Sequence, residues 1–199
     1  MKNVIFDYGN VVIQWRPFLA LSHLFETEEE MKDVFEKTGF STWNKEQDRG
    51  RSWEEGIALM KVQHPEYVHV YEAYAAGLVP AHSTLVAGTT EIIERLHVKG
   101  VGLYGITNAA RESFEAVKAA SAAVRLIKAT IVSGDHQLVK PDPAIFELCL
   151  EEFGLDAQDC IFVDDLAANC DGAKSVGMDA IHFVGADDLE QQLVSRGIL

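Results

Sequence analysis

The chain has 199 residues, of which 48% are hydrophobic, and a formal net charge of −14 at pH 7. Its length suits one domain, or a domain core that carries a small insert, with enough apolar residues to bury a sizeable core. The acidic charge argues against nucleic acids and anionic membranes as partners, because both bind basic surfaces. We find no basic-then-apolar leader and no apolar stretch of the ~18 residues that a membrane span needs, so we expect a cytoplasmic protein.

The first third of the chain predicts one strand followed by a long helical stretch. Residues 4–6 are apolar and predict a buried strand. From about residue 17 to residue 79 the β signal disappears. Two helix starts are marked there by Thr27 and Ser52, each of which is followed three residues later by a glutamate. The Arg49-Gly50 pair, just before Ser52, indicates that one helix ends and another begins.

From residue 90 onward helices and strands alternate. We expect helices at about residues 90–98, 110–123, 143–153 and 167–176, followed in turn by strands at 101–106, 129–132, 161–163 and 180–183. Strands joined by helices predict a parallel, doubly wound sheet. The predicted fold is therefore α/β, with a Rossmann-like core of residues 1–15 and 82–199 and a small helical cap of residues 16–81 inserted after the first strand.

Carboxylates stand at the ends of two predicted strands. Asp7 follows the first strand, and the pair Asp164-Asp165 follows the strand at 161–163. Ligands of open parallel sheets bind at the carboxyl ends of the strands, so these carboxylates can meet there. Close carboxylates raise one another's pKa, and a bound divalent cation removes that cost. Oxygen-only ligation suits Mg²⁺, and one of the carboxylates can also act as a nucleophile.

Two further segments bring polar groups to the same edge of the sheet. Thr107 and Asn108 follow the strand at 101–106, where a hydroxyl residue caps a helix or accompanies phosphate binding at a helix start. Lys140 lies just before Pro143, which suits the first turn of a helix. Alone, the threonine would more often be a helix cap and the lysine a solvated residue. The four segments together, in this order, give a strong signal.

Other motifs have simpler interpretations. Residues 100–105 match G-x-G-x-x-G, but they follow a predicted helix and enter a strand, the reverse of the dinucleotide-binding context, so we assign the glycines to a helix end and to close sheet packing. His182 is expected to be a hydrogen-bonded structural residue, and the three cysteines small core residues. The three tryptophans are expected mainly in packing, with Trp43 a candidate for both packing and binding.

The four segments resemble motifs one to four of the haloacid dehalogenase superfamily, and the helical insert lies where that family carries its cap. The resemblance covers nearly the whole chain. It implies a doubly wound core with strand order 5-4-1-2-3 and a four-helix cap that closes over the active site. It also implies a small phosphorylated metabolite as the partner molecule, while the acidic net charge argues against nucleic acid and membrane as partners.

The resemblance implies a role for each polar residue at the edge of the sheet. Asp7 is similar to the nucleophile that takes up the phosphoryl group. Thr107 and the backbone of Asn108 are similar to the pair that binds phosphate. Lys140 is similar to the lysine that neutralises charge between nucleophile and phosphate. Asn10 is a further candidate for substrate binding.

The resemblance also implies a Mg²⁺ site. Its ligands would be Asp7, the main-chain carbonyl of Gly9, and Asp164. Asp165 and Asn169 would orient the water molecules of the metal, as outer residues of metal sites commonly do. Bound Mg²⁺ and Lys140 would together lessen the repulsion between a carboxylate nucleophile and a phosphate.

One position departs from the family pattern. Phosphatases of this family usually carry a second aspartate two residues after the nucleophile, as acid and base, and here that residue is Gly9. General acid–base assistance is worth roughly 10²–10⁴-fold. The D-x-G-N form resembles a branch that includes sugar-1-phosphate phosphatases, whose leaving group departs more easily. Asn10, a water molecule or a cap residue such as Arg49 are the substitutes that the sequence offers.

Three functions remain open on the sequence. The leading one is a Mg²⁺-dependent phosphatase that hydrolyses a small phosphomonoester, such as a sugar phosphate, through an aspartyl-phosphate. The second is a 2-haloacid dehalogenase, in which Asp7 attacks carbon; the acidic pair Asp164-Asp165 argues against it, because the family's dehalogenases carry uncharged residues there. The third is a non-catalytic or weakly active regulatory protein that binds metal and phosphate.

Overall fold

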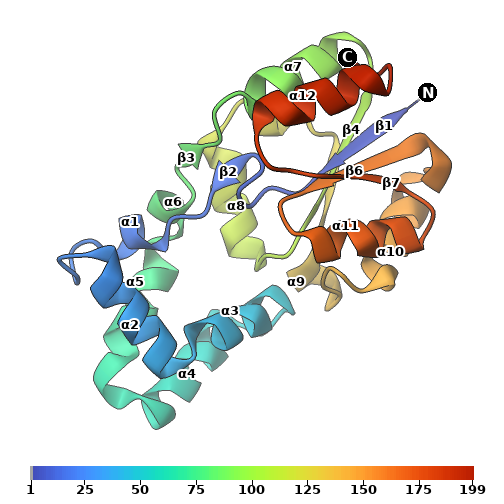
Figure 1. The fold of residues 1–199 in the computed structure, drawn as a ribbon. Coiled ribbons are helices and arrows are strands. Elements are labelled where there is room, and N and C mark those ends of the chain that lie inside the picture. Colours follow the sequence, from blue (N-terminus) through green and yellow to red (C-terminus); the bar gives the residue numbers. More distant parts are fainter. Residues whose placement is uncertain (1) are drawn as a thin grey trace.

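A five-stranded parallel sheet lies beside a separate group of helices in the computed structural model, which describes residues 2–199 (Figure 1). Its strands are β1 (Asn3–Phe6), β4 (Gly102–Thr107), β5 (Ala129–Val132), β6 (Cys160–Asp164) and β7 (Asp179–His182). They lie in the order β5-β4-β1-β6-β7, and each neighbouring pair is parallel. Numbered along the chain as five core strands and read from β7, this is the order 5-4-1-2-3.

Helices cover both faces of the sheet. On one face lie α7 (Thr89–Val98), α8 (Arg111–Ala120) and α12 (Ala186–Ser195), and on the other lie α10 (Pro143–Phe153) and α11 (Ala167–Ser175). Successive side chains of a strand point to opposite faces, so Val4 and Phe6 of β1 belong to the first hydrophobic cluster and Ile5 to the second. Burial of both faces explains why the strands read as continuous apolar runs.

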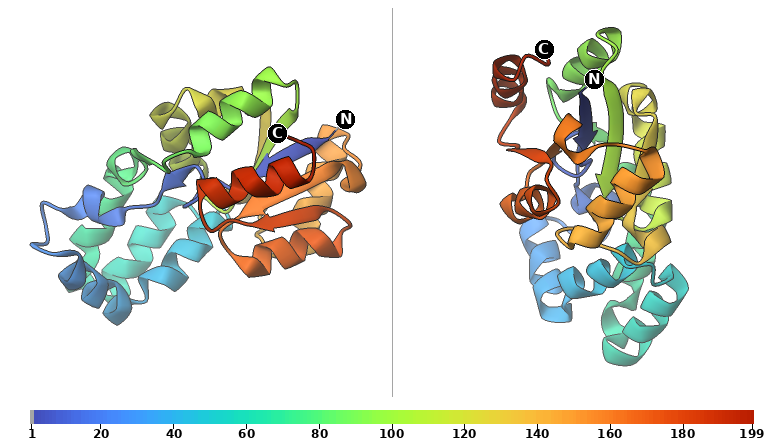
Figure 2. Two further views of the ribbon diagram at one scale, coloured as in Figure 1. Left: turned by 45° about the horizontal axis from the view of Figure 1, so that its top comes forward. Right: turned by 90° about the vertical axis from the view of Figure 1, so that its right-hand side faces the viewer.

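Residues 17–81 form a helical insert, which we define by its helices. These are α1 (Pro17–Leu21), α2 (Glu28–Thr38), α3 (Phe40–Asp48), α4 (Trp53–Gln63), α5 (Val68–Ala76) and α6 (Leu78–Ala81). The insert has its own hydrophobic cluster, in which the ring of Phe40 contacts those of Trp43, Tyr71 and Tyr74. Two further views show the insert to one side of the sheet (Figure 2).

The chain leaves and re-enters the core through a short two-stranded sheet. Its antiparallel strands are β2 (Ile13–Gln14) and β3 (Thr84–Leu85). These strands were not predicted from the sequence, because two residues are too short a run to show a β pattern. The pair holds the two connections between core and insert side by side.

The predicted helix starts in the insert are present, with one difference in detail. Ser52 and Glu55 form a reciprocal capping box at the start of α4. At the start of α2 the side chain of Thr27 accepts from the N–H of Glu30, but the carboxylate of Glu30 accepts from the N–H of Glu26 instead of that of Thr27. The expected break near residue 50 is also present, since α3 ends at Asp48 and Gly50 has a φ of 95°.

In the core, two helices differ from prediction. Helix α8 ends at Ala120 because Ser121 is extended, and a 3₁₀ turn, Ala123–Leu126, takes up the remaining residues. A short helix, α9 (Ser133–His136), follows β5 where no helix was predicted. Within residues 2–199, no helix combines the length and apolar character required to cross a membrane.

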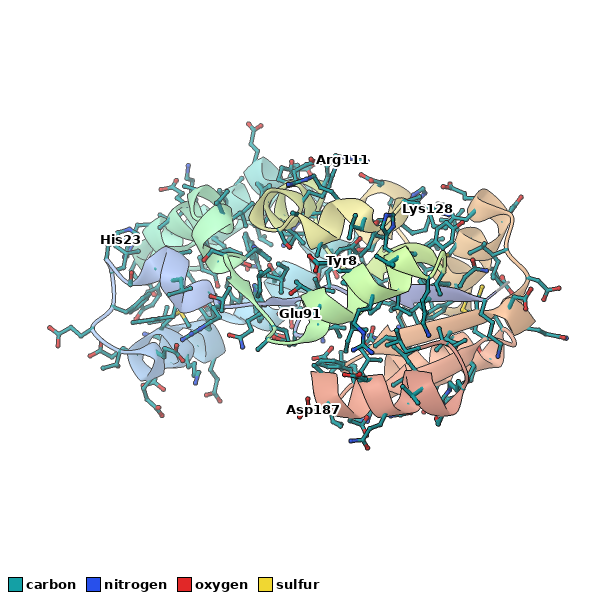
Figure 3. All side chains as sticks on the ribbon, turned by 90° about the horizontal axis from the view of Figure 1, so that it is seen from above. Tyr8, His23, Glu91, Arg111, Lys128 and Asp187 are labelled. Carbon is teal, nitrogen blue, oxygen red and sulfur yellow. The ribbon has the colours of Figure 1, made fainter. Side chains whose placement is uncertain are left out.

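The G-x-G-x-x-G segment has the structural role that its context indicated. Gly100 follows α7 with a φ of 76°, and both Gly102 and Gly105 lie inside β4. A Cβ atom on Gly105 would lie 2.6 Å from the ring of Tyr8, whose hydroxyl group hydrogen-bonds Thr130 Oγ1 at 2.7 Å. Tyr8 lies in the α/β core, far from His23 at the outer end of the insert (Figure 3). Gly100 therefore ends the helix, whereas Gly102 and Gly105 permit close packing in the sheet.

Candidate active site

The predicted carboxylates meet at one edge of the sheet. Asp7 directly follows β1, and its N–H donates to the carbonyl of Val163 in β6, the strand beside it. Asp164 ends β6 and Asp165 follows it. Asp7, Asp164 and Asp165 each place a carboxylate oxygen within 4.8 Å of the others. Strand adjacency therefore brings together residues more than 150 positions apart.

Lys140 lies between two of these carboxylates. Its ammonium group donates to Oδ1 of Asp7 and to Oδ2 of Asp164, both at 2.7 Å, and to the carbonyl of Ile106 at 3.1 Å. Burial alone would lower the pKa of Lys140, but the two carboxylates raise it above its usual range. Burial raises the pKa of Asp7, and Lys140 opposes that effect. The lysine thus stays charged in a buried site.

The two neighbouring aspartates have different surroundings. Asp164 is fully buried; its oxygens accept from Lys140, from the N–H of Leu166 at 2.8 Å and from the side chain of Asn169 at 3.0 Å. Asp165 is half-buried, and Oδ2 accepts from Asn10 at 3.3 Å. Burial raises the pKa of Asp165. Both oxygens of Asp164 therefore accept hydrogen bonds from other groups of the protein, whereas Asp165 faces the cavity described below.

The turn after β1 shapes the space beside Asp7. Asn10 has a φ of 56°, a conformation that asparagine tolerates better than most residues, and its N–H donates to the carbonyl of Ile13. A Cβ atom on Gly9 would lie 3.8 Å from Oδ2 of Asp7. The turn thus brings the main chain at Gly9 close to the carboxylate oxygen that Lys140 does not contact.

The predicted phosphate-binding residues lie at the end of β4. Thr107 is the last residue of the strand and is buried. The side-chain amide of Asn108 donates to the carbonyl of Lys140 at 2.9 Å and accepts from its N–H at 2.8 Å. Asn108 therefore fixes the main chain that carries Lys140, a use of its side chain that the sequence did not indicate.

A cavity of about 650 Å³ joins these residues to the helical insert. Asp7, Gly9, Thr107, Lys140 and Asp165 line its core side, and residues of α2, α3 and α5 line the other. The volume lies within the roughly 300–1,000 Å³ typical of small-molecule sites. Asp164 is not among the lining residues.

Several residues that line this cavity, among them Asp48 and Trp15, were not recognised as site residues from the sequence, and two candidates, Trp43 and Arg49, lie elsewhere. Asp48, the last residue of α3, belongs to no motif, and Trp15 was assigned to packing; both line the cavity. Trp43 is buried in the insert, with its indole N–H donating to the carbonyl of Gly56 at 2.9 Å. Arg49 pairs with Glu46 at 2.8 Å on an exposed surface and does not line the cavity. Only the folded insert reveals which of its side chains face the site.

The chain is similar to a phosphatase, to part of a longer cyclase and to a solved hydrolase structure. It is 25% identical over 187 residues to the sesquiterpene phosphatase AstK of Aspergillus oryzae, covering 92% of this chain and 89% of that protein. It is 30% identical over 93 residues to the drimenol cyclase DrtB of Aspergillus calidoustus, covering 47% of this chain and only 18% of that longer protein. The magnesium-bound hydrolase YfnB of Bacillus subtilis has the same fold, with a TM-score of 0.76 and 19% identity over 97% of this chain and 98% of that one.

The family model for haloacid dehalogenase-like hydrolases matches residues 1–177, which include every segment of the site described above. The five-stranded parallel sheet with a helical insert after its first strand is the fold that the resemblance implied. The acidic cluster at the carboxyl edge of the sheet agrees with a hydrolase site of this kind. The chain belongs to the haloacid dehalogenase-like hydrolase family.

Proposed function

We propose that the protein is a Mg²⁺-dependent phosphatase that hydrolyses a small phosphomonoester through an aspartyl-phosphate on Asp7. One observation carries the proposal. A buried lysine, Lys140, contacts Asp7 within a cavity that is also lined by the carboxylate of Asp165. A nucleophile, a fixed cation and further oxygen ligands side by side are what phosphoryl transfer requires, since its catalysis depends on positioning and charge stabilisation.

Each residue of the site would have its own role in the first step, the transfer of the phosphoryl group to Asp7. Oδ2 of Asp7, the oxygen free of Lys140, would attack phosphorus, because Oδ1 already accepts from the lysine. Lys140 would offset the charge on the transferring phosphoryl group, and Thr107 with the backbone of Asn108 would bind its oxygens. Asn108 also holds the main chain of Lys140, so loss of its side chain would misplace the cation.

The donor set around Asp7 fits Mg²⁺, which prefers carboxylate and carbonyl oxygens. We assign the direct contacts to Asp7, the carbonyl of Gly9 and Asp165, exchanging the roles that the sequence suggested for Asp164 and Asp165. The hydrogen bonds support this exchange, because both oxygens of Asp164 already have partners and Asp165 faces the cavity. When bound, the ion would supply positive charge to the phosphoryl oxygens.

Asp164 and Asn169 then have a supporting role. Asp164 holds the ammonium group of Lys140 at 2.7 Å, and Asn169 donates to both oxygens of Asp164. This chain of contacts fixes the lysine against Asp7 without occupying the cavity. Such outer contacts orient catalytic groups and metal ligands.

The relatives support a small phosphorylated substrate, and two chemical classes of substrate agree with them. The D-x-G-N motif resembles a branch that includes sugar-1-phosphate phosphatases. AstK, which aligns over most of both chains, is instead a sesquiterpene phosphatase. The volume of the cavity admits either kind of substrate. A 2-haloacid dehalogenase remains disfavoured by the carboxylates Asp164 and Asp165 at the site.

Hydrolysis of p-nitrophenyl phosphate tests the proposed function. We expect turnover that requires Mg²⁺ and is lost in Asp7→Asn, with 2-chloropropionate left unchanged. Phosphate release without Mg²⁺, or in the Asp7→Asn variant, would contradict the mechanism. Binding of Mg²⁺ and phosphate by a folded protein without any turnover would favour the regulatory alternative.

A further inference from the structure

The cavity that contains Asp7 has an apolar wall built by the core and the helical insert together. The apolar side chains that form it are Ile13, Trp15, Phe35, Phe40, Phe114 and Val117. They come from the chain between core and insert, from α2 and α3 of the insert, and from α8 of the core. Because this wall and the proposed nucleophile Asp7 line one cavity, the alcohol part of a bound phosphate ester can lie against the wall.

The aromatic rings of this apolar wall stack on one another, and the one polar atom among them, the indole nitrogen of Trp15, already has a hydrogen-bond partner. The rings of Phe35 and Phe40 stack with centroids 3.6 Å apart, and the ring of Trp15 is roughly parallel to that of Phe40 at 6.5 Å. The indole N–H of Trp15 donates to the hydroxyl of Tyr74 at 3.0 Å. Trp15 nevertheless remains 39% exposed. The wall thus offers ring surface to a ligand.

We infer that the physiological substrate is the phosphate ester of a hydrophobic alcohol, whose hydrocarbon part lies against the apolar wall while its phosphate lies at Asp7. This inference rests on the proposed phosphatase function. Removal of hydrocarbon surface from water is favourable in proportion to its area, and aromatic walls add contact area without rotamer cost. Polar residues such as Ser41 and Asn44 also line the cavity, so hydrophobic and sugar phosphates must be compared directly.

The first test is a series of n-alkyl phosphates from ethyl to octyl, with glucose 1-phosphate alongside. We expect kcat/KM to rise by roughly threefold to fourfold with each methylene that the wall buries. A flat series, or a preference for glucose 1-phosphate, would overturn the inference while leaving the phosphatase intact. Absence of Mg²⁺-dependent p-nitrophenyl phosphate hydrolysis would instead show that the proposed function has failed.

The second test changes the apolar wall. Trp15→Ala is expected to reduce kcat/KM for octyl phosphate about tenfold and to leave ethyl phosphate nearly unchanged, and Trp15→Phe to keep most of the octyl preference. Leu59→Ala is the matched control, since Leu59 is 38% exposed on α4 and does not line the cavity. An equal loss for both phosphates in folded Trp15→Ala, or an octyl loss in Leu59→Ala, would overturn the inference.

A different observation concerns Asp48 at the end of α3. Its main-chain carbonyl accepts from Oγ of Ser133 at 2.6 Å, and the same Oγ accepts from the N–H of Ala109 at 2.9 Å. Ala109 follows Thr107 and Asn108, so this contact ties the end of α3 to the phosphate-binding segment. The side chain of Asp48 lines the cavity, and no residue within 2–199 donates a hydrogen bond to its carboxyl group.

Burial of Asp48, against the pull of the cations around it, brings the pKa of its carboxyl group close to neutral pH. Burial raises the pKa of Asp48 to about 7, and Arg49, Lys140 and Lys45 oppose that rise. The phenol of Tyr74 on α5 also faces this carboxylate. A carboxylic acid that is half protonated near pH 7 is suited to donate and take up a proton.

We propose that Asp48 is the general acid and base of the reaction, in place of the aspartate that the family usually carries at position 9. Like the substrate inference, this proposal rests on the phosphatase function. As the bond from Asp7 to phosphorus forms and the bond to the alcohol oxygen breaks, the proton of Asp48 passes to that oxygen. Water then attacks the aspartyl-phosphate, its proton returns to Asp48, and phosphate leaves with Asp7 restored.

The test compares Asp48→Asn with Glu46→Gln, an exposed acid on the same helix that pairs with Arg49. Asp48→Asn is expected to lower kcat/KM for alkyl phosphates by roughly 10²–10⁴-fold, and to affect p-nitrophenyl phosphate much less, because p-nitrophenolate leaves without a proton. The alkyl rate of the unaltered protein should fall as pH rises above about 7, and the variant should lack this fall. An equal loss for both substrates, or an unchanged pH profile, would overturn the proposal.

Discussion

The ammonium nitrogen of Lys140 lies 2.7 Å from Oδ1 of Asp7, and the two side chains are 2% and 10% exposed. The same nitrogen lies 2.7 Å from Oδ2 of Asp164. One buried cation therefore pairs with two buried carboxylates, and its removal would leave both without their shared countercharge. This relationship joins the stability of the core to the chemistry of the site.

Replacement of Lys140 by Met should destabilise the fold and abolish catalysis. Removing one member of a buried ionic group leaves its partners uncompensated and costs about 3–5 kcal/mol. Urea denaturation with a metal chelator present measures the free energy of unfolding. Added Mg²⁺ should recover part of the stability, since the ion supplies positive charge at the same carboxylates. A variant as stable as the unaltered protein without Mg²⁺ would contradict this account.

Replacement of Asp7 by Asn should abolish turnover and preserve the fold. The substitution keeps the size of the side chain but removes the carboxylate that we propose as the nucleophile, so we expect kcat to fall by roughly 10³-fold or more. Circular dichroism checks the fold, and p-nitrophenyl phosphate measures the rate. Activity within about tenfold of the unaltered protein would rule out Asp7 as the nucleophile.

Substitutions of Asp164, the last residue of β6, and of Asp165, which follows it, should differ in their effect on Mg²⁺ binding. Asp165→Asn should weaken Mg²⁺ binding directly because its carboxylate faces the cavity, whereas Asp164→Asn should act mainly by loosening Lys140. Calorimetric titration of both variants with Mg²⁺ measures the difference. The opposite ranking would return Asp164 to the role of direct ligand that the sequence suggested.

A new acid at position 9 should compensate for the loss of Asp48. Gly9 does not have a positive φ, and a Cβ atom there meets only Oδ2 of Asp7, at 3.8 Å, so aspartate fits the backbone. Gly9→Asp added to Asp48→Asn should therefore recover alkyl phosphate turnover, by up to the roughly 10²–10⁴-fold that an acid supplies. If the folded double variant still binds Mg²⁺ but recovers nothing, the effect of Asp48→Asn is not the loss of an acid.

Alanine at position 105 should disturb both the core and the site. Its Cβ atom would lie 2.6 Å from the ring of Tyr8, which is fully buried, and 3.0 Å from Oγ1 of Thr130. Such overpacking costs about 1–3 kcal/mol. Because Tyr8 directly follows Asp7 in the chain, a shift of Tyr8 should also move Asp7. A fall in kcat should therefore accompany the fall in unfolding free energy. Thermal denaturation and kinetics on one sample test the two effects together.

The sequence predicted the core because its signals are local. Apolar runs at 4–6, 129–132 and 161–163 coincide with buried strands, and the helices between them require a parallel sheet. Asp7, Thr107, Lys140 and Asp164 could be found because each stands at the end of a strand or the start of a helix. The capping residue Ser52 could also be identified, since a capping box depends on residues three apart.

Local patterns did not predict features that depend on distant contacts. The two-residue strands β2 and β3 exist only because each pairs with the other across some 70 residues. The extended Ser121 ends α8 earlier than its helical pattern indicated. Trp15 and Asp48 carry no motif, and their position at the cavity depends on how the insert packs against the core.

The family, the α/β core and the residues that gather at its carboxyl edge could therefore be predicted from the sequence, because strand ends and helix starts are specified by neighbouring residues. The different contacts of Asp164 and Asp165, and the side of the insert that faces the cavity, became visible in the folded protein alone. Both depend on burial and on hydrogen bonds between residues far apart in the chain, such as that from Lys140 to Asp7 across 133 positions. Periodicity and motif spacing contain no information about such contacts.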